Sequence, residues 1–128
     1  MKILVVTGGR DYDNENHLHT VLDGFQEQHH EHRIILLHGN ATGADTLARK
    51  WAEQNSIRSL AFEADWQRFG KSAGPVRNLQ MLRHAATLTD SKSDVTVIAF
   101  PGGRGTKNCV ETARTLDITV LEIPNMTH

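Results

Sequence analysis

The chain has 128 residues, a length that fits one compact domain spanning residues 1–128. Apolar residues make up 38% and charged residues 23%, which excludes a disordered chain. The formal net charge of -1 gives no broad positive field for nucleic acid or an anionic membrane. Cys109 is the one cysteine, and Lys2 runs straight into a short apolar segment without a charged-then-apolar leader. We therefore expect a reducing, cytoplasmic setting with no disulfide, signal peptide or membrane span.

Five short runs rich in Val, Ile, Leu or Phe recur along the chain, and they are continuously apolar rather than alternating. Strands that are covered on both faces require this pattern, so the runs predict a mostly parallel sheet. The predicted strands are Lys2–Thr7, Arg33–His38, Arg58–Glu63, Asp94–Phe100 and Thr119–Ile123.

Helical spacing fills the segments between these strands. Two segments carry apolar residues on one helix face. One follows Thr42, a candidate N-cap, and the other follows Pro75, a residue type that suits the first turn of a helix. Further helices are predicted over Asn14–His29 and Thr106–Leu116. The residues that mark the two faces are Ala44, Leu47, Ala48, Trp51 and Ala52 in the first helix and Val76, Leu79, Leu82 and Ala86 in the second. This alternation predicts an α/β fold, a single Rossmann-like doubly wound three-layer sandwich with a mostly parallel sheet of about five strands.

Glycine-rich turns follow three of the predicted strands. The carboxyl ends of parallel strands meet at one edge of an open sheet, so these turns predict a ligand site at a topological switch point. Glycine lets backbone N–H groups approach a ligand closely, and a helix amino-terminus adds partial positive charge, so we expect a phosphorylated ligand. The glycines are Gly8 and Gly9 after the first strand, Gly39 and Gly43 after the second, and Gly102, Gly103 and Gly105 after the fourth.

The segment 101–106, with the sequence Pro-Gly-Gly-Arg-Gly-Thr, lies directly between a predicted strand and a predicted helix. A bare glycine-rich turn is as typical of a tight strand-to-helix connection as of a phosphate site. Thr106 adds a hydroxyl at the helix start, where it either caps the helix or binds a phosphate oxygen. The amino-terminal turn lacks the G-x-G-x-x-G pattern, which disfavours a conventional NAD-dependent dehydrogenase.

Charged and aromatic residues accompany these turns. Asp45 either holds a ribose hydroxyl, acts as an acid or base, or is only a first-turn carboxylate favoured by the helix dipole. Arg77, expected near the end of a long loop, either binds a phosphate in bidentate fashion or is a solvated surface residue. Trp66 in the same loop either stacks on a base or anchors packing. Arg10 and Asp11 either complete the site or form a loop salt bridge.

Metal and thiol chemistry are not expected. His29, His30 and His32 form a cluster that lacks the spaced cysteine or carboxylate partners of known zinc patterns. Cys109 has no evident base nearby in sequence and is expected to be inert packing, while His38 draws interest only because it ends a strand beside a glycine turn. We therefore predict no metal and no cofactor.

Five groups of residues together form a recognisable pattern: Gly8-Gly9-Arg10, Gly43-Ala44-Asp45 with Trp51-Ala52, Ala64-Asp65-Trp66, Ala73-Gly74-Pro75-Val76-Arg77-Asn78 and Pro101-Gly102-Gly103-Arg104-Gly105-Thr106. Over nearly the whole chain, this pattern resembles the YspA/YpsA-related branch of the SLOG superfamily, named for the SMF/DprA and LOG proteins. The resemblance implies a Rossmann-like domain that binds nucleotides or nucleotide-derived ligands.

LOG enzymes, which release a base from a nucleoside 5′-monophosphate, are similar through the P-G-G-x-G-T motif and an upstream arginine that Arg77 matches. Their motif continues to a catalytically important glutamate, and the matching position here is Cys109. Cysteine cannot act as a carboxylate, so LOG-type hydrolysis needs Asp45, Asp65 or Glu111 as a substitute. Glu111 is turned about 200° from the matching position around a helix, so it is not expected to occupy the same place.

The leading hypothesis is a domain that binds a nucleotide-like small molecule, with LOG-like phosphoribohydrolase activity and DprA-like single-stranded DNA binding as alternatives. The near-neutral charge argues against a nucleic-acid partner, and the resemblance to LOG proteins leaves a homodimer open. The candidate catalytic residues are Asp45, Asp65 and Arg77. The candidate ligand-binding residues are Gly8, Gly9, Arg10, Gly39, Gly43, Asp45, Trp66, Arg77, Asn78, Gly102, Gly103, Arg104, Gly105 and Thr106.

Overall fold

The computed structural model describes residues 1–125, and its strands form one sheet of five parallel strands. The strands are β1 (Lys2–Thr7), β2 (Ile34–His38), β3 (Arg58–Ala61), β4 (Val95–Ala99) and β5 (Thr119–Glu122). Their order is β3-β2-β1-β4-β5, so the chain winds outward from β1 in one direction and then reverses by placing β4 beside β1. This reversal is the switch point at which open α/β sheets bind ligands.

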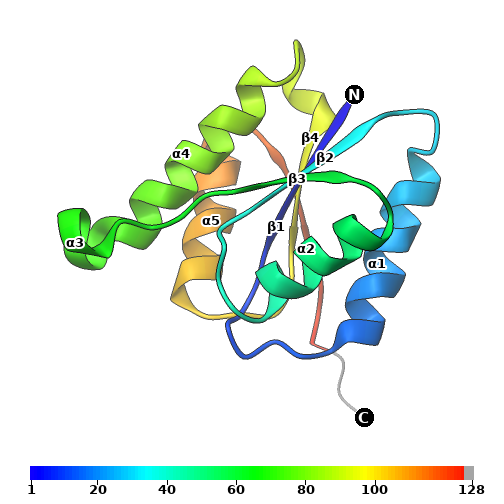
Figure 1. Cartoon of the computed structure of the whole chain (residues 1–128). Coiled ribbons are helices and arrows are strands. Elements are labelled where there is room, and N and C mark those ends of the chain that lie inside the picture. The colour runs from blue at the N-terminus through cyan, green and yellow to red at the C-terminus, as the bar shows by residue number, and fades with distance from the viewer. Residues whose placement is uncertain (126–128) are drawn as a thin grey trace.

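Helices cover both faces of the sheet. The helices are α1 (Glu15–Gln28), α2 (Ala44–Gln54), α3 (Trp66–Phe69), α4 (Ala73–Thr87) and α5 (Arg104–Thr115), with 3₁₀ turns η1 (Gly70–Ser72) and η2 (Lys92–Asp94). Figure 1 shows α1 and α2 on one side of the sheet and α4 and α5 on the other, with the single-turn α3 at the far end of α4. The predicted Rossmann-like three-layer α/β fold is confirmed.

The continuously apolar strands result from burial on both faces. Ile3 and Val5 of β1 pack in the core beneath α4 and α5, whereas Leu4 and Val6 pack in the core beneath α1 and α2. All four side chains are 0% exposed. Because successive side chains of a strand point to opposite faces, both parities must be apolar here.

The carboxyl ends of the central strands lie level with one another. Val6 of β1 pairs with His38 of β2, and Thr7 of β1 pairs with Ala99 of β4. Each of these strands then passes into a glycine-containing turn, and α2 and α5 begin at this edge of the sheet (Figure 1). The register therefore gathers the three glycine turns at one end of the molecule.

The predicted cap of α2 is wrong, because Thr42 is not its N-cap. Gly43 takes that position with a φ of 75°, and a Cβ added there would overlap the carbonyl oxygen of Gly9. This close approach excludes a side chain, so α2 starts without a side-chain cap. The hydroxyl of Thr42 instead donates to the carbonyl oxygen of Arg10 at 3.3 Å.

The segment between β3 and α4 is not the long loop that the sequence predicts. The side chain of Asp65 accepts a hydrogen bond from the backbone N–H of Arg68 at 3.0 Å, and this cap begins α3. The turn η1 follows, and α4 begins at Ala73, two residues before Pro75. A helical corner therefore replaces the loop and carries its side chains on a defined backbone.

The buried face of α4 is rotated relative to the prediction. Of the four predicted core positions only Leu82 is fully buried, while Val76, Leu79 and Ala86 are half-buried. The polar residue Asn78 is buried instead, because its amide bonds to residues of α5. The buried residues of α4 are Ala73, Gly74, Asn78, Met81, Leu82 and Ala85.

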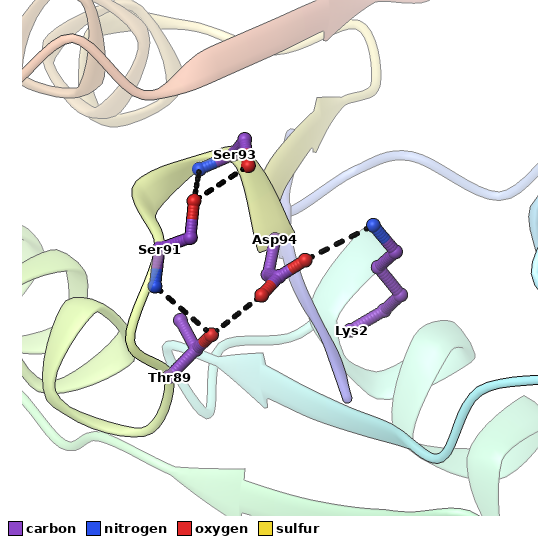
Figure 2. Close-up of polar contacts among 5 residues, drawn as sticks. All are labelled: Lys2, Thr89, Ser91, Ser93 and Asp94. Atoms are coloured by element: carbon purple, nitrogen blue, oxygen red, sulfur yellow. Dashed lines mark hydrogen bonds and ion pairs between the residues drawn. The ribbon is translucent and has the colours of Figure 1, made fainter.

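A polar cluster lies at the opposite, amino-terminal edge of the sheet, where β4 does not extend to Asp94 as predicted. Asp94 ends the turn η2, and its carboxylate accepts hydrogen bonds from the ammonium of Lys2 at 3.1 Å and the hydroxyl of Thr89 at 2.7 Å (Figure 2). The hydroxyls of Ser91 and Ser93 lie 2.7 Å apart in the same turn. The other strand boundaries differ from the predicted ones by at most two residues.

Within residues 1–125, none of the helices combines the length and apolar composition that crossing a membrane requires.

Candidate functional site

A cavity of about 1250 Å³ lies at the carboxyl edge of the sheet. It is bounded by the turn after β1, the turn after β4 and the corner formed by α3 and the start of α4. This volume exceeds what a drug-sized ligand usually fills, so a nucleotide has ample room. The predicted site residues that line it are Gly8, Gly9, Arg10, Asp45, Trp66, Arg77 and residues 102–106.

The three glycine turns contact one another directly. The backbone N–H of Gly9 donates to the carbonyl oxygen of Pro101 at 2.8 Å, which joins the turns after β1 and β4. The carbonyl oxygen of Gly9 accepts from the backbone N–H of Ala44 at 3.2 Å, which joins the turn after β1 to the start of α2. The turn after β1 is thus the centre of the edge, with the cavity above it.

The turn after β4 leads into an uncapped helix. Gly103 is the N-cap of α5 and makes no side-chain cap bond, and Thr106 lies inside the first helical turn rather than at the cap. The first backbone N–H groups of a helix have no intrahelical acceptor and carry partial positive charge. A Cβ added at Gly102 would overlap the Thr106 hydroxyl, so only glycine permits this tight turn. The result is a group of unpaired donors beside the cavity.

Asp45 lies in the first turn of α2, as the helix-dipole interpretation has it, but its carboxylate is buried and makes specific contacts. Its side chain is only 5% exposed, and its Oδ2 accepts hydrogen bonds from the backbone N–H groups of Gly39 at 3.1 Å and Ala41 at 3.2 Å. Burial raises the pKa of this carboxyl to about 6, against the lowering effect of the Ala41 N–H and the Arg77 guanidinium. Asp45 therefore stabilises the turn after β2 through these two hydrogen bonds, and it also lines the cavity.

Arg77 is half-buried and already has protein partners. Its Nη1 donates to the carbonyl oxygens of Gly39 at 2.5 Å and Phe62 at 3.4 Å, and its Nε donates to Oδ1 of Asn78 at 2.9 Å. Burial lowers the pKa of the guanidinium, while nearby Asp45 opposes that shift. Arg77 thus joins the ends of β2 and β3 to α4 rather than lying free on the surface.

Asn78 is 3% exposed and links two helices beside the cavity. Its Nδ2 donates to the carbonyl oxygen of Gly105 at 3.2 Å and to Oδ1 of Asn108 at 3.0 Å. Because its amide is fully engaged, Asn78 positions the first turn of α5 instead of facing a ligand.

Four predicted site residues do not line the cavity: Gly39, Gly43, Asp65 and Asn78. Gly39 lies against the guanidinium of Arg77, and Gly43 lies against the turn after β1. Asp65 is exposed and caps α3. These residues shape the walls of the site from outside it.

Arg10 lies over the ring of Trp66, and both side chains line the cavity. The guanidinium carbon of Arg10 lies 5.7 Å from the centre of the Trp66 ring, within cation–π range. Among residues 1–125, Arg10 forms no ion pair with Asp11. The interpretation that Arg10 forms a salt bridge within its loop is therefore wrong for the described residues.

Comparison with known proteins decides the family. A model of the YspA, cpYpsA-related SLOG family (YAcAr) matches residues 2–69. The Gene 61 protein of Mycobacterium phage D29 is 32% identical over an alignment of 130 positions, which covers 94% of this chain and 95% of the phage protein. The chain belongs to the YspA/cpYpsA-related SLOG family. The resemblance inferred from the motifs is thereby confirmed.

Two solved structures share the fold of this SLOG protein. DprA from Streptococcus pneumoniae has a TM-score of 0.71 at 20% identity, over 98% of this chain and 51% of DprA. The structural genomics target TM1055 has a TM-score of 0.65 at 14% identity, over 94% of this chain and 72% of TM1055. The chain thus spans about half the length of DprA. At these identities the likeness concerns the fold alone.

Cys109 of this SLOG protein belongs to the core beneath α4 and α5. It is 0% exposed and does not line the cavity, and burial raises the pKa of its thiol to about 11. A thiol that stays protonated at neutral pH is a poor nucleophile.

Within residues 1–125, no group of three or more His, Cys, Asp or Glu side chains is arranged to hold a metal ion.

Sequence reasoning missed several residues that line the cavity, among them Tyr12, Asn14, Lys71 and Asn108. The Tyr12 ring packs against Phe100 in a tilted arrangement with ring centres 5.3 Å apart, and its buried hydroxyl has no hydrogen-bond partner within the described chain. Tyr12 and Asn14 follow the first glycine turn, and Lys71 falls between Trp66 and Arg77. The sequence offered one signal for these residues, which is that they lie close to residues already assigned to the site. Their residue types are too common in loops for that signal to single them out.

Proposed function

We propose that this SLOG protein binds a nucleotide or a nucleotide-derived phosphorylated ligand in the cavity at the carboxyl ends of β1 and β4. The observation that carries the proposal is the uncapped start of α5, whose donors border a cavity at the switch point of the sheet. Family membership supports a nucleotide-related function in general. The phosphate would lie against residues 102–106.

The charges around the cavity fit an anion with a polar sugar. Arg10, Lys71 and Arg104 contribute positive side chains that form no ion pair within residues 1–125. Asp45 uses Oδ2 for the two backbone N–H groups, so its Oδ1 is left to accept a ribose hydroxyl.

Calorimetry and thermal-shift measurements with mono-, di- and cyclic nucleotides and NAD-related compounds test the proposal. We expect micromolar to millimolar binding that Arg104→Glu weakens at least tenfold, because it reverses a charge beside the helix start. Lys107→Glu is the matched control, since Lys107 lies one turn along the same helix and does not line the cavity. If none of these compounds binds in either assay, the proposal is contradicted.

Asp45 favours a second candidate function, hydrolysis of the N-glycosidic bond of a nucleotide. It is a buried carboxylate that lines the cavity, and its raised pKa suits acid–base work near neutrality. In this reaction the C1′–N bond breaks, the oxygen of water bonds to C1′, and the base nitrogen takes a proton from water. An Asp45 carboxylate would stabilise the positive charge that develops on the ribose.

Chromatographic detection of free base and ribose 5-phosphate separates catalysis from binding. If base is released, Asp45→Asn is expected to abolish the release, because it removes the charge from the cavity. Asp65→Asn is the control, since Asp65 is exposed and lies outside the cavity lining. Release that is unaffected by Asp45→Asn would remove this candidate.

Binding of single-stranded DNA should be tested alongside the nucleotides, because DprA shares the fold. The net charge of -1 predicts no salt-sensitive retention of an oligonucleotide. Retention that weakens with added salt would favour the DNA alternative over a small-molecule site.

A further inference from the structure

Trp66 is unusual because a large aromatic side chain is left 49% exposed at the rim of a cavity. It is the first residue of α3, a single turn that Asp65 caps and that ends at Gly70, where φ is 54°. The short helix buries none of its residues, so core packing does not explain the tryptophan. The exposed indole surface at the rim of this polar cavity is therefore available to a ligand.

The indole lies near the start of α4. A Cβ added at the buried Gly74 would lie 3.7 Å from Cη2 of Trp66, so the edge of the ring rests near the start of α4. Across the ring lies Arg10, which is exposed and extends from the turn after β1. The ring is thus supported by a fixed helix, while the group over its face is a flexible side chain.

The spacing between Arg10 and Trp66 is close to that of an open stack. Carbon atoms in favourable contact lie about 3.5 Å apart, so a flat base with one group on each face needs about 7 Å between those groups. The guanidinium carbon lies 5.7 Å from the ring centre. An outward movement of at least about 1.3 Å by the exposed arginine is therefore needed to admit an aromatic ring between the two.

The turn that carries Arg10 also borders the phosphate-binding part of the site. Gly9, the preceding residue, bonds to Pro101, and residues 102–106 follow directly. A ligand with its phosphate at the start of α5 can therefore extend past Arg10 toward Trp66 within one cavity.

We propose that Trp66 and Arg10 form the base-binding subsite of the cavity, with an aromatic base stacked on the indole and covered on its outer face by the guanidinium. The inference rests on the proposed function and adds its ligand class, nucleotides with an intact base rather than sugar phosphates. Bicyclic purines cover more of the indole than pyrimidines and bind more tightly here.

Calorimetry with AMP and with ribose 5-phosphate tests the subsite separately from the phosphate site. Trp66→Ala is expected to weaken AMP binding about 5- to 150-fold, the usual range for loss of one base–aromatic stack, and to leave ribose 5-phosphate binding unchanged. Trp66→Phe retains a smaller ring and is expected to give an intermediate affinity. Gln67→Ala, at an exposed neighbouring position outside the cavity lining, is the control.

Fluorescence gives a second readout because the two tryptophans differ in environment. Trp51 is 1% exposed, whereas Trp66 is 49% exposed. AMP is expected to quench the Trp66 emission, and ribose 5-phosphate to bind without quenching it. Trp66→Phe removes the responsive signal and leaves that of Trp51.

Equal affinity for AMP and ribose 5-phosphate, unaffected by Trp66→Ala, would overturn the base subsite and leave the proposed function intact. Absence of binding by either compound, and by the wider set of nucleotides, would instead overturn the proposed function and the subsite with it. Arg10→Ala provides an independent check, since it removes the outer cover and is expected to weaken AMP more than ribose 5-phosphate.

Discussion

The buried carboxylate of Asp45 accepts a hydrogen bond from the backbone N–H of Gly39 at 3.1 Å. Desolvation raises its pKa from 3.8 to about 6 in the folded chain. Folding therefore favours the protonated side chain, and this contribution to stability is fully present below about pH 3.8 and is lost as the pH rises through about 6. The difference between a pKa of 3.8 and one of about 6 corresponds to roughly 3 kcal/mol.

Asp45→Asn is expected to flatten this pH dependence. The amide oxygen of asparagine can accept from both backbone N–H groups that now bond to Oδ2, and the side chain carries no charge. The free energy of unfolding at about pH 7.5 should rise by up to roughly 3 kcal/mol, while that at about pH 4 changes little. Urea unfolding across this range measures the effect, with the exposed Asp13→Asn as control. Parallel curves for Asp45→Asn and the parent chain would contradict the assignment.

Gly102 and Gly103 are neighbours with different steric surroundings. A Cβ on Gly102 would overlap the Thr106 hydroxyl and lie 2.7 Å from the backbone nitrogen of Gly9, whereas Gly103 has open space. Gly102→Ala is expected to cost about 1–3 kcal/mol of stability and to weaken nucleotide binding, because the two turns must separate. Gly103→Ala should cost less, up to about 1 kcal/mol, because alanine is a poorer N-cap than glycine but meets no overlap there. Chemical unfolding and calorimetry of the pair decide this, and equal effects would refute the steric argument.

Asn78 provides a test of how the start of α5 is positioned. Asn78→Ala removes the donor to Gly105 and Asn108 and the acceptor for Arg77. Unpartnered groups in a buried interface are costly, so we expect a loss of about 2–3 kcal/mol in the free energy of unfolding. The exposed Gln80→Ala on the same helix should be nearly neutral. A neutral Asn78→Ala would show that the linkage does not stabilise the helix pair.

The fold and the edge of the sheet that holds the cavity were accessible from the sequence because they depend on repeating patterns. Continuous apolar runs located the strands, and glycine turns after three of them located the edge that holds the cavity. The role of single polar residues was not accessible, since Asn78 and Asp65 have residue types that suit a ligand as well as a helix contact. Tertiary packing decides between these roles: Asn78 faces α5, and Asp65 caps α3. The rotated face of α4 escaped prediction for the same reason, because periodicity cannot detect a buried asparagine.

Asp94 is expected to show a pH dependence of opposite sign to that of Asp45. Hydrogen bonds from the Thr89 hydroxyl and then from the Lys2 ammonium lower the pKa of its carboxyl (Figure 2). Its contribution to stability is therefore present above the unfolded-state pKa of Asp, about 3.9, and is lost as the pH falls through the lower folded-state value. Asp94→Asn should lower the melting temperature at neutral pH and have no effect in strong acid.

Thr89→Val separates the two partners of Asp94, because it removes the hydroxyl and keeps Lys2 in place. It is expected to raise the pKa of Asp94 and to reduce the melting temperature at neutral pH. Added salt should leave the Thr89→Val effect unchanged and shrink that of Lys2→Met, since only the ion pair is screened. Melting curves at low and high ionic strength distinguish them. A Thr89→Val effect that fades with salt would mean that the hydroxyl acts only by orienting the ion pair.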